Sequence, residues 1–348
     1  MLIDFANMHN GDEDDKRCNL SAELRTDLDK AGRDRIDAVC ITHLDRDHCN
    51  GFGDFFWLSH AAKYQDDGRI KIGQLWVPAA AILEDNLAED ARIIRSEARH
   101  RLREGKGILV FSYPERLKDW MEKEGIDYES RKHLIVDAGK LVPGFAKNGP
   151  EGAEFFVHCP FAWRQDENTV VSRNEDSIVI HVTFLEGGRE TKLFLASDVD
   201  HETLSAIVQT SRKHGNERRL YWDVMKLPHH CSYLSLGPER GQDEAQPAPD
   251  VKWLFEDARE GSYIVSPSCP IPEKGADDDN DQPPHRQAAN YHRRISAGCD
   301  GTFTVTMEYP SKANPKSFAY SVTALGVGLE IAAPRVSRTA SASTPRAG

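Results

Sequence analysis

The chain has 348 residues, of which 39% are hydrophobic and 29% charged, and its formal net charge is −12. This length and composition can supply the core of one large domain or of two ordinary ones. The sequence contains no run of about 18 apolar residues and no basic-then-apolar leader, so we expect neither a transmembrane helix nor a signal peptide. The acidic balance argues against a general polyanion-binding surface, although it allows a local basic patch.

Seven cysteines, an odd number, are scattered along the chain without a Cys-x-x-Cys pair. This usage fits reduced thiols in a cytoplasmic protein better than it fits a disulfide framework. We therefore expect a cytoplasmic protein with no membrane partner.

Strand and helix patterns alternate in the first half of the chain. Residues 1–7 are predicted as a strand that runs into a turn, and residues 20–31 as a helix with Ser21 as its N-cap. Further strands are predicted at 38–42, 72–77 and 109–113, and helical structure at 79–103 and within 120–137. We interpret residues 79–137 as a helical insertion.

The predicted helix at 79–103 contains a basic run. Its members, with the lysine that follows, are Arg92, Arg95, Arg99, Arg101, Arg103 and Lys106. Acidic residues alternate with them, which favours a solvated helix face with i,i+4 ion pairs. A substrate-facing basic patch is the alternative.

The second half of the chain is richer in strand patterns. Strands are predicted at 154–158, 177–184, 192–196, 222–227 and 263–266, with a hairpin turn at Gly187-Gly188. Helices are predicted at 201–215 and 287–295, and residues 237–250 as a polar loop. Residues 302–309 and 318–322 are predicted to form a terminal hairpin. We expect one domain over residues 1–330 and a disordered Ser/Thr/Ala/Pro-rich tail over 331–348.

One stretch concentrates side chains that can bind metal. The apolar run 38–42 predicts a buried strand, and His43, Asp45, Asp47 and His48 follow it within six positions. A rigid strand fixes geometry and the loop after it supplies ligands. A charged turn would also use aspartates, but four such residues together favour a metal site.

Three later segments repeat this arrangement of an apolar strand followed by a potential ligand. Asp198 ends one of them, His229 and His230 follow another, and His285 lies beyond a third. Histidine and carboxylate ligands suit zinc, manganese or iron, and carboxylate-rich sets favour the harder ions.

The order His43-x-Asp-x-Asp-His48, then Ser-Asp198, then Pro-His229-His-Cys-Ser resembles the metallo-β-lactamase superfamily of metal-dependent hydrolases. The similarity is closest to the hydrolase domain of bacterial DNA-uptake (competence) channel proteins. That group has a similar Pro-His-His-Gly-Ser segment, a late histidine like His285, and an Asn-x-x-Ser like that of Asn174 to Ser177. The resemblance covers about residues 1–309.

The resemblance implies a four-layer αβ/βα sandwich with one or two divalent ions at one edge, between two sheets. It implies the following ligands: His43 and Asp45 for a first ion, Asp47 and His48 for a second, Asp198 as a bridge, and His229 or His230 with His285 to complete the site. Asp4, Asn174 and Ser177 are expected to support these ligands from behind.

Catalytic roles follow from the same resemblance for Asp47, His230 and His285. The ions would lower the pKa of a bound water and polarise the bond to be cut. Asp47 would hold or deprotonate that water, and a later histidine would stabilise the leaving oxygen.

The chain departs from the family pattern at three places. Asp45 stands where most members carry histidine, so the first site should prefer manganese, iron or a weakly held zinc. No Gly-His-Thr/Ser segment precedes Asp198, and His158 matches it poorly, which makes His158 a core or supporting residue. Only three residues precede Asp4, where members normally carry a β-hairpin, so we expect a truncated N-terminal strand pair.

The function that this resemblance implies is hydrolysis of a phosphoester, with nucleic acid among the candidate substrates. Only 31 positions separate Asp198 from His229, which leaves no room for the large domain that RNA-cleaving relatives insert there. A small-molecule ester or lactone hydrolase is the second hypothesis. A non-catalytic module that keeps the fold and binds a nucleotide or a protein is the third.

Overall fold

The computed structural model describes residues 1–167, 172–276 and 282–330. These residues form a mixed α/β structure with one parallel sheet, one mixed sheet and a two-stranded hairpin. The predicted tail at 331–348 lies outside the described residues. No helix among the described residues is long and apolar enough to cross a membrane.

The first sheet is entirely parallel, in the order β1-β2-β4-β5-β6 with β3 beside β4. Its strands are β1 (Leu2–Ile3), β2 (Arg35–Cys40), β3 (Phe56–Trp57), β4 (Ile70–Pro78), β5 (Ile108–Phe111) and β6 (Ile135–Val136). Leu2, Val39, Leu75 and Ile108 are in register across four of them. Strands of a parallel sheet are buried on both faces, which explains continuous apolar runs such as that of β5.

Helices precede, interrupt and follow these strands. They are α1 (Leu20–Lys30), α2 (Arg46–Cys49), α3 (Phe52–Phe55), α4 (Ala79–Leu83), α5 (Glu89–Glu104), α6 (Glu115–Lys123) and α7 (Tyr128–Arg131). The N-cap of α1 is Asn19, whose side chain accepts from the N–H of Ala22, so the prediction of Ser21 as the cap was wrong.

The second sheet has the order β12-β11-β10-β9-β8-β7. Its strands are β7 (Ala153–Cys159), β8 (Val179–Glu186), β9 (Arg189–Leu195), β10 (Val224–Lys226), β11 (Tyr263–Ser266) and β12 (Thr302–Val305). The strands β7, β8 and β9 pair antiparallel, whereas β9 to β12 are parallel. Gly187 and Gly188 have φ of 56° and 83°, which is why glycine suits this two-residue hairpin turn.

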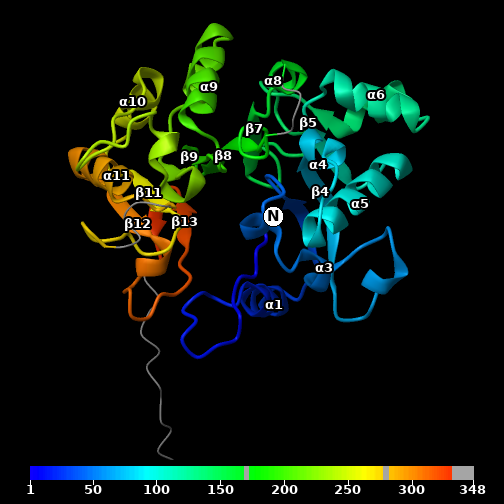
Figure 1. Cartoon of the computed structure of the whole chain (residues 1–348), viewed down its shortest axis with the longest axis horizontal. Coiled ribbons are helices and arrows are strands. Elements are labelled where there is room, and N and C mark those ends of the chain that lie inside the picture. Colours follow the sequence, from blue (N-terminus) through cyan, green and yellow to red (C-terminus); the bar gives the residue numbers. More distant parts are fainter. Residues whose placement is uncertain (168–171, 277–281, 331–348) are drawn as a thin grey trace, which may run out of the picture.

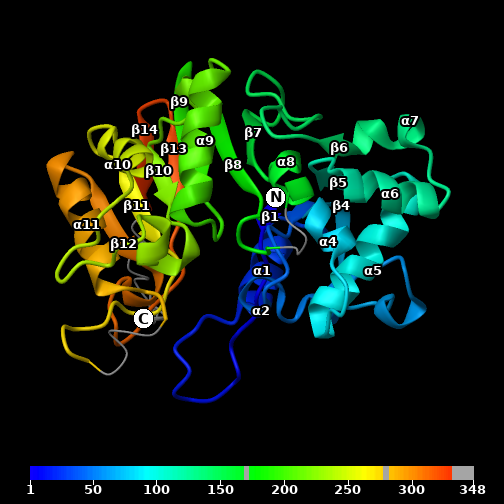
Figure 2. The same ribbon diagram turned by 45° about the horizontal axis from the view of Figure 1, so that its top comes forward.

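The two sheets face each other, and helices cover their outer faces (Figures 1 and 2). Side chains such as Trp76 and Ile180 pack between the sheets, while their chain neighbours Leu75 and Val179 face the helices. Across the interface the ring of Trp76 meets that of Phe155 edge-on at 5.7 Å. The helices over the second sheet include α9 (His201–Lys213), α10 (Pro249–Glu256) and α11 (Arg286–Gly298), and α8 (Ala162–Glu167) lies after β7. The chain is therefore a layered α/β sandwich.

Three sequence predictions about these elements were wrong. The helix predicted at 79–103 is divided into α4 and α5 by a turn in which Asn86 has φ of 58°. The supposed helical insertion also supplies β5 and β6 of the first sheet. The strand β12 pairs with β11, and the terminal hairpin is instead β13 (Tyr320–Thr323) with β14 (Gly326–Leu329). Local sequence pattern indicates a strand but does not identify its partner.

Candidate metal centre

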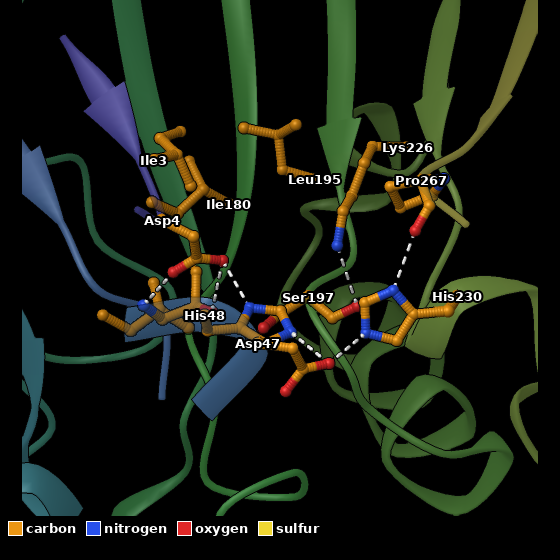
Figure 3. A pocket seen from close by; sticks show the side chains of 12 residues that line it. Ile3, Asp4, Asp47, His48, Ile180, Leu195, Ser197, Lys226, His230 and Pro267 are labelled. Atoms are coloured by element: carbon orange, nitrogen blue, oxygen red, sulfur yellow. Dashed lines mark hydrogen bonds and ion pairs between the residues drawn. The ribbon is translucent and has the colours of Figure 1, made fainter. Parts of the chain in front are cut away.

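Four side chains from three separate segments converge at one end of the sheets, and Figure 3 shows three of them, Asp47, His48 and His230. Asp47 and His48 lie on α2, just after β2; Asp198 follows β9; and His230 lies in the turn after β10. Each offers one ligand atom, and these atoms all lie within 4.8 Å of one another. Parallel strands end at the same edge of a sheet, so β9 and β10 bring Asp198 and His230 together.

Asp198 lies between the two imidazoles. Its Oδ2 is 3.3 Å from Nε2 of His48 and 3.1 Å from Nε2 of His230. The Oδ2 of Asp47 is 2.9 Å from the same His230 nitrogen. The side chain of Asp198 is only 4% exposed, whereas that of Asp47 is 48% exposed. Asp198 is thus an interior ligand candidate, and Asp47 faces solvent.

The imidazole rings are oriented from behind by partners at Nδ1. The Nδ1 of His48 lies 2.8 Å from a carboxylate oxygen of Asp4, and that of His230 lies 2.8 Å from the carbonyl oxygen of Pro267. A carbonyl only accepts, so Nδ1 of His230 carries the proton and the Nε2 of the neutral ring presents its lone pair. Partners of this kind are typical of metal-binding histidines.

The inward-facing atoms of this group lack hydrogen-bond partners. Within the described residues, Nε2 of His48, Nε2 of His230 and Oδ1 of Asp198 are buried and make no hydrogen bond of acceptable geometry. Buried polar groups without partners are rare, because each costs about 1–3 kcal/mol. A cation bound among these side chains would satisfy the two imidazole nitrogens, so the donors present fit a divalent ion.

Asp4 organises two histidines of the stretch at residues 42–48. Its carboxylate accepts from the N–H and the hydroxyl of Thr42, at 2.7 and 2.8 Å, and contacts His48. Because the Thr42 hydroxyl donates to Asp4, its oxygen is left to accept from Nδ1 of His43, 3.1 Å away. The Nε2 of His43 therefore also carries a lone pair, and it is buried without a hydrogen bond among the described residues.

His43 and Asp45 lie beside the group but are not members of it. The rings of His43 and His48 have centroids 4.0 Å apart, and Nε2 of His43 is 3.6 Å from Oδ2 of Asp45. The other oxygen of Asp45 accepts from Nη1 of Arg173 at 2.7 Å. A direct metal role for these two residues remains a prediction.

The structure distinguishes His230 from His229. Only His230 is in the four-residue group; the ring of His229 lies 6.3 Å from that of His230 and lines an open cleft. His285 precedes α11 and is buried, and its Nδ1 accepts from the N–H of Tyr233 at 3.3 Å. Its Nε2 then carries the proton, which suits a hydrogen-bond donor better than a metal ligand.

Strained backbone surrounds the group. Five non-glycine residues there have positive φ: Asp4 (58°), Ser197 (44°), His229 (44°), His230 (51°) and Cys231 (68°). Such conformations cost of order 1–3 kcal/mol each and cluster at functional sites. The turn is held in place because His229 donates its N–H to Ser197 O at 3.0 Å and His285 donates to Cys231 O at 3.1 Å.

Asn174 and Ser177 form a turn behind the first ligand loop. The Ser177 hydroxyl donates to the Asn174 carbonyl at 2.7 Å, and the next N–H, that of Ile178, donates to the Thr42 carbonyl at 3.1 Å. The turn thus joins the start of β8 to the residue before His43. This contact with the backbone of Thr42 links the two residues to the ligand loop, and their support of the ligands remains a prediction.

The electrostatic field of the group favours positive charge. Burial by itself lowers the pKa of His48, but Asp4 and Asp198 outweigh it and raise the pKa to about 10. Burial likewise lowers the pKa of His230, and Asp198 with Asp47 raises it to about 9. Contact with His230 lowers the pKa of Asp47 to about 2. The carboxylates that hold protons on these rings would equally hold a metal cation.

Two hollows meet at the group. A cavity of about 310 Å³ extends between the sheets and is lined by Ile3, Ile180, Leu195 and Lys226 as well as by Asp47, His48 and His230 (Figure 3). An open cleft of about 700 Å³ lies on the other side, where Asp47, Asp198 and His230 line it. Lys16, Arg17, Lys316 and Phe318 also line this cleft.

The basic run at residues 92–106 does not line the cleft. Arg95 and Arg99 donate to the carbonyls of Glu84 and Ile82, and Arg101 is buried against Glu97 at 2.6 Å. These arginines stabilise packing around α5 within the described residues. The cleft takes its positive charge from other segments.

Sequence reasoning missed several residues of the site. Lys226 donates to the Ser197 carbonyl at 3.3 Å and lies 3.8 Å from Oδ1 of Asp198. Arg173 and the Pro267 carbonyl were also missed. The segment Lys226-Leu-Pro-His carries the lysine beside the histidine motif, so a cation there could have been noticed. A backbone carbonyl leaves no signal in a sequence.

His158 lies away from the group, in the interior beneath α9. Its Nε2 donates to the Arg219 carbonyl at 3.0 Å, and its ring stacks on Phe194 at 5.1 Å. His181 is its neighbour and bonds the Tyr221 carbonyl at 3.0 Å. The interpretation of His158 as a core histidine agrees with these contacts.

We expect His158 to make the fold acid-sensitive. Burial lowers its pKa to about 4, below the ordinary value of 6.5, so its neutral form stabilises the fold above pH 6.5. That stability is lost as the pH falls from 6.5 towards 4, amounting to about 2 kcal/mol between pH 7 and pH 5. Urea unfolding of His158→Gln should show a pH dependence smaller by this amount. Identical pH dependence in the two proteins would contradict the prediction.

Comparison with protein-family models gave no match for this chain. Comparison with curated proteins gave none either.

Proposed function

We propose that this chain is a metal-dependent hydrolase of the metallo-β-lactamase type and that its substrate is a phosphoester. The observation that carries the proposal is the group of Asp47, His48, Asp198 and His230. Its imidazoles are held at Nδ1 while their Nε2 atoms converge without hydrogen bonds. The layered α/β sandwich, with this group at the strand ends, supports the fold type.

Two imidazoles and two carboxylates would hold the ion. This set suits zinc or manganese, with iron as a further candidate. When bound, a divalent ion supplies Lewis acidity, which acidifies a water and neutralises developing negative charge. Asp4 and the Pro267 carbonyl keep the two imidazoles oriented throughout the reaction.

Asp47 is the residue best placed to handle the proton of an attacking water. Half of its side chain is exposed, and it lines both the cavity and the cleft. A carboxylate there can orient the water and accept its proton. From the family resemblance we assign stabilisation of the leaving oxygen to a later histidine, His285.

The charges of the cleft support an anionic substrate. Lys16, Arg17 and Lys316 line it although the protein as a whole is acidic. Arg17 is already paired with Asp15 at 2.8 Å, so Lys16 and Lys316 are the cations more available to a ligand. Phe318 in the same cleft offers an apolar surface for a substituent of the phosphoester.

A combined metal and substrate test examines this proposal. Purified protein should contain at least about half an equivalent of zinc, manganese or iron by elemental analysis. Reconstituted protein should be screened against bis-p-nitrophenyl phosphate, single-stranded DNA, RNA and a lactone. If only the lactone is hydrolysed, the substrate class is a carboxylic ester and not a phosphoester. If the protein contains no metal, the hydrolase proposal is wrong and a non-catalytic binding module is the remaining hypothesis.

Asp47→Ala is expected to lower kcat/KM for the phosphoester at least about 100-fold, because general-base assistance typically contributes this much or more. The matched control is Asp54→Ala on α3, an exposed carboxylate close in sequence, which should retain full activity. Full activity of Asp47→Ala on every substrate would show that the site is wrongly assigned.

A further inference from the structure

The neighbourhood of His43 and Asp45 contains part of a second donor set. The Nε2 of His43 and Oδ1 of Asp198 are buried without hydrogen bonds among the described residues, and Asp45 lies next to His43. His43 and Asp45, with Nε2 and Oδ2 3.6 Å apart, are two neighbouring donors for another divalent ion beside the first, whereas Oδ1 of Asp198 lies 3.8 Å from the Lys226 ammonium. A second ion can bind there only if the Asp45 carboxylate is ionised and free to coordinate it.

The carboxylate of Asp45 is already bound by the guanidinium of Arg173. Its Nη1 donates to Oδ1 of Asp45 at 2.7 Å, and the rest of its guanidinium binds Glu84. Nε lies 2.9 and 3.0 Å from the two carboxylate oxygens of Glu84, and Nη2 lies 2.6 Å from one of them. The guanidinium is therefore fixed at both ends, so its position does not depend on Asp45 alone.

We propose that this site binds a single divalent ion and that the Arg173 guanidinium takes the place of a second one. The inference rests on the proposed function, because it assumes that the four-residue group binds metal. The guanidinium is positively charged at every physiological pH and neutralises Asp45 as a metal ion would. A second dication would have to displace Arg173 from a planar, multiply bonded geometry and would be repelled by its charge.

The side-chain chemistry makes Arg173 a positioning residue. It contacts Asp45 and Glu84, not the four-residue group, and it is one-third exposed. It holds Oδ1 of Asp45, while Oδ2 of the same carboxylate lies 3.6 Å from Nε2 of His43 and the His43 ring packs on that of His48. The same Asp45 would become a ligand beside His43 if the guanidinium were removed.

Manganese alone is the probe for the test. Metal-free protein is titrated with Mn²⁺ by calorimetry, and the loaded protein is examined by electron paramagnetic resonance. Wild type should bind one equivalent and give the six-line signal of an isolated ion. Arg173→Gln should bind two equivalents and give the broadened signal of coupled ions. Arg173→Met provides a second variant if the glutamine variant does not fold, which thermal melting will show.

Three further variants identify the cause. Arg173→Lys retains a cation and should still bind one equivalent. Adding Asp45→Asn to Arg173→Gln should return the count from two to one. Arg103→Gln is the matched control: Arg103 is also partly exposed and pairs with Glu124 at 2.8 Å, and this variant should bind one equivalent.

The outcomes separate the two proposals. Two equivalents bound by wild type, or one equivalent bound by folded Arg173→Gln and Arg173→Met, would overturn the role of Arg173 and leave the hydrolase proposal intact. Less than about half an equivalent in wild type, with Mn²⁺ and with Zn²⁺, would overturn the proposed function itself.

Discussion

Asp198→Asn is expected to weaken metal binding by about 100-fold or more and to abolish hydrolysis, because Asp198 is the buried carboxylate between both imidazoles. Burial raises the pKa of Asp198, but the adjacent His230 and His48 outweigh it, so the carboxylate is ionised and ready to bind a cation. Asparagine keeps the shape of the side chain and removes its charge. Calorimetric titration of the metal-free variant with Zn²⁺ measures the loss.

Thermal melting gives an independent measure of the same effect. Bound metal stabilises the folded state by mass action, so Zn²⁺ should raise the melting temperature of wild type and not that of Asp198→Asn. Asp200→Asn is the matched control from the same loop. Asp200 caps α9 by accepting from the N–H of Thr203 at 2.8 Å, and asparagine caps equally well, so this variant should bind Zn²⁺ normally. Unchanged affinity in Asp198→Asn would contradict the assigned ligand set.

Glu97→Ala is expected to lower the free energy of unfolding by about 3–5 kcal/mol, as is usual when one partner of a buried ion pair is removed. The fully buried carboxylate of Glu97 binds Arg101 at 2.6 Å and Nδ1 of His60 at 2.8 Å. It also accepts from the N–H groups of Ser59 and His60 and from the Ser59 hydroxyl. Alanine leaves Arg101 as an uncompensated buried charge.

The pH dependence provides a second readout for Glu97. Burial raises its pKa, but His60 and Arg101 outweigh burial and the net pKa lies well below the ordinary 4.5. The stabilisation is therefore complete above pH 4.5 and is lost as the pH falls below that value. Urea unfolding at pH 7 should separate Glu97→Ala from Glu104→Ala, an exposed change on the same helix that is expected to be nearly neutral. Equal stability of the two variants would show that the network contributes little.

Most strands could be predicted because an apolar run indicates a buried strand regardless of which strand it pairs with. The runs that became β2, β9, β10 and β11 were predicted at nearly their observed positions. The pairing of the strands could not be predicted. The sequence of Thr302–Val305 suits a strand of a hairpin and an edge strand of a parallel sheet equally well, and the structure pairs it in parallel with β11. The helix α10 was missed because the polar, proline-containing residues before it favour a loop, although Pro249 is well suited to the first turn of a helix.

The sequence by itself identified the candidate ligands, because side chains able to bind metal follow short strands at His43 to His48, Asp198 and His230. It could not determine which of these donors share one point. Only the tertiary structure decided that His230 rather than His229 joins the group, through a strained turn held by Ser197 and Pro267. It likewise joined Arg173 to Asp45 across 128 positions of the chain. Contacts between distant segments follow from packing of the sheets, and no local pattern reports them.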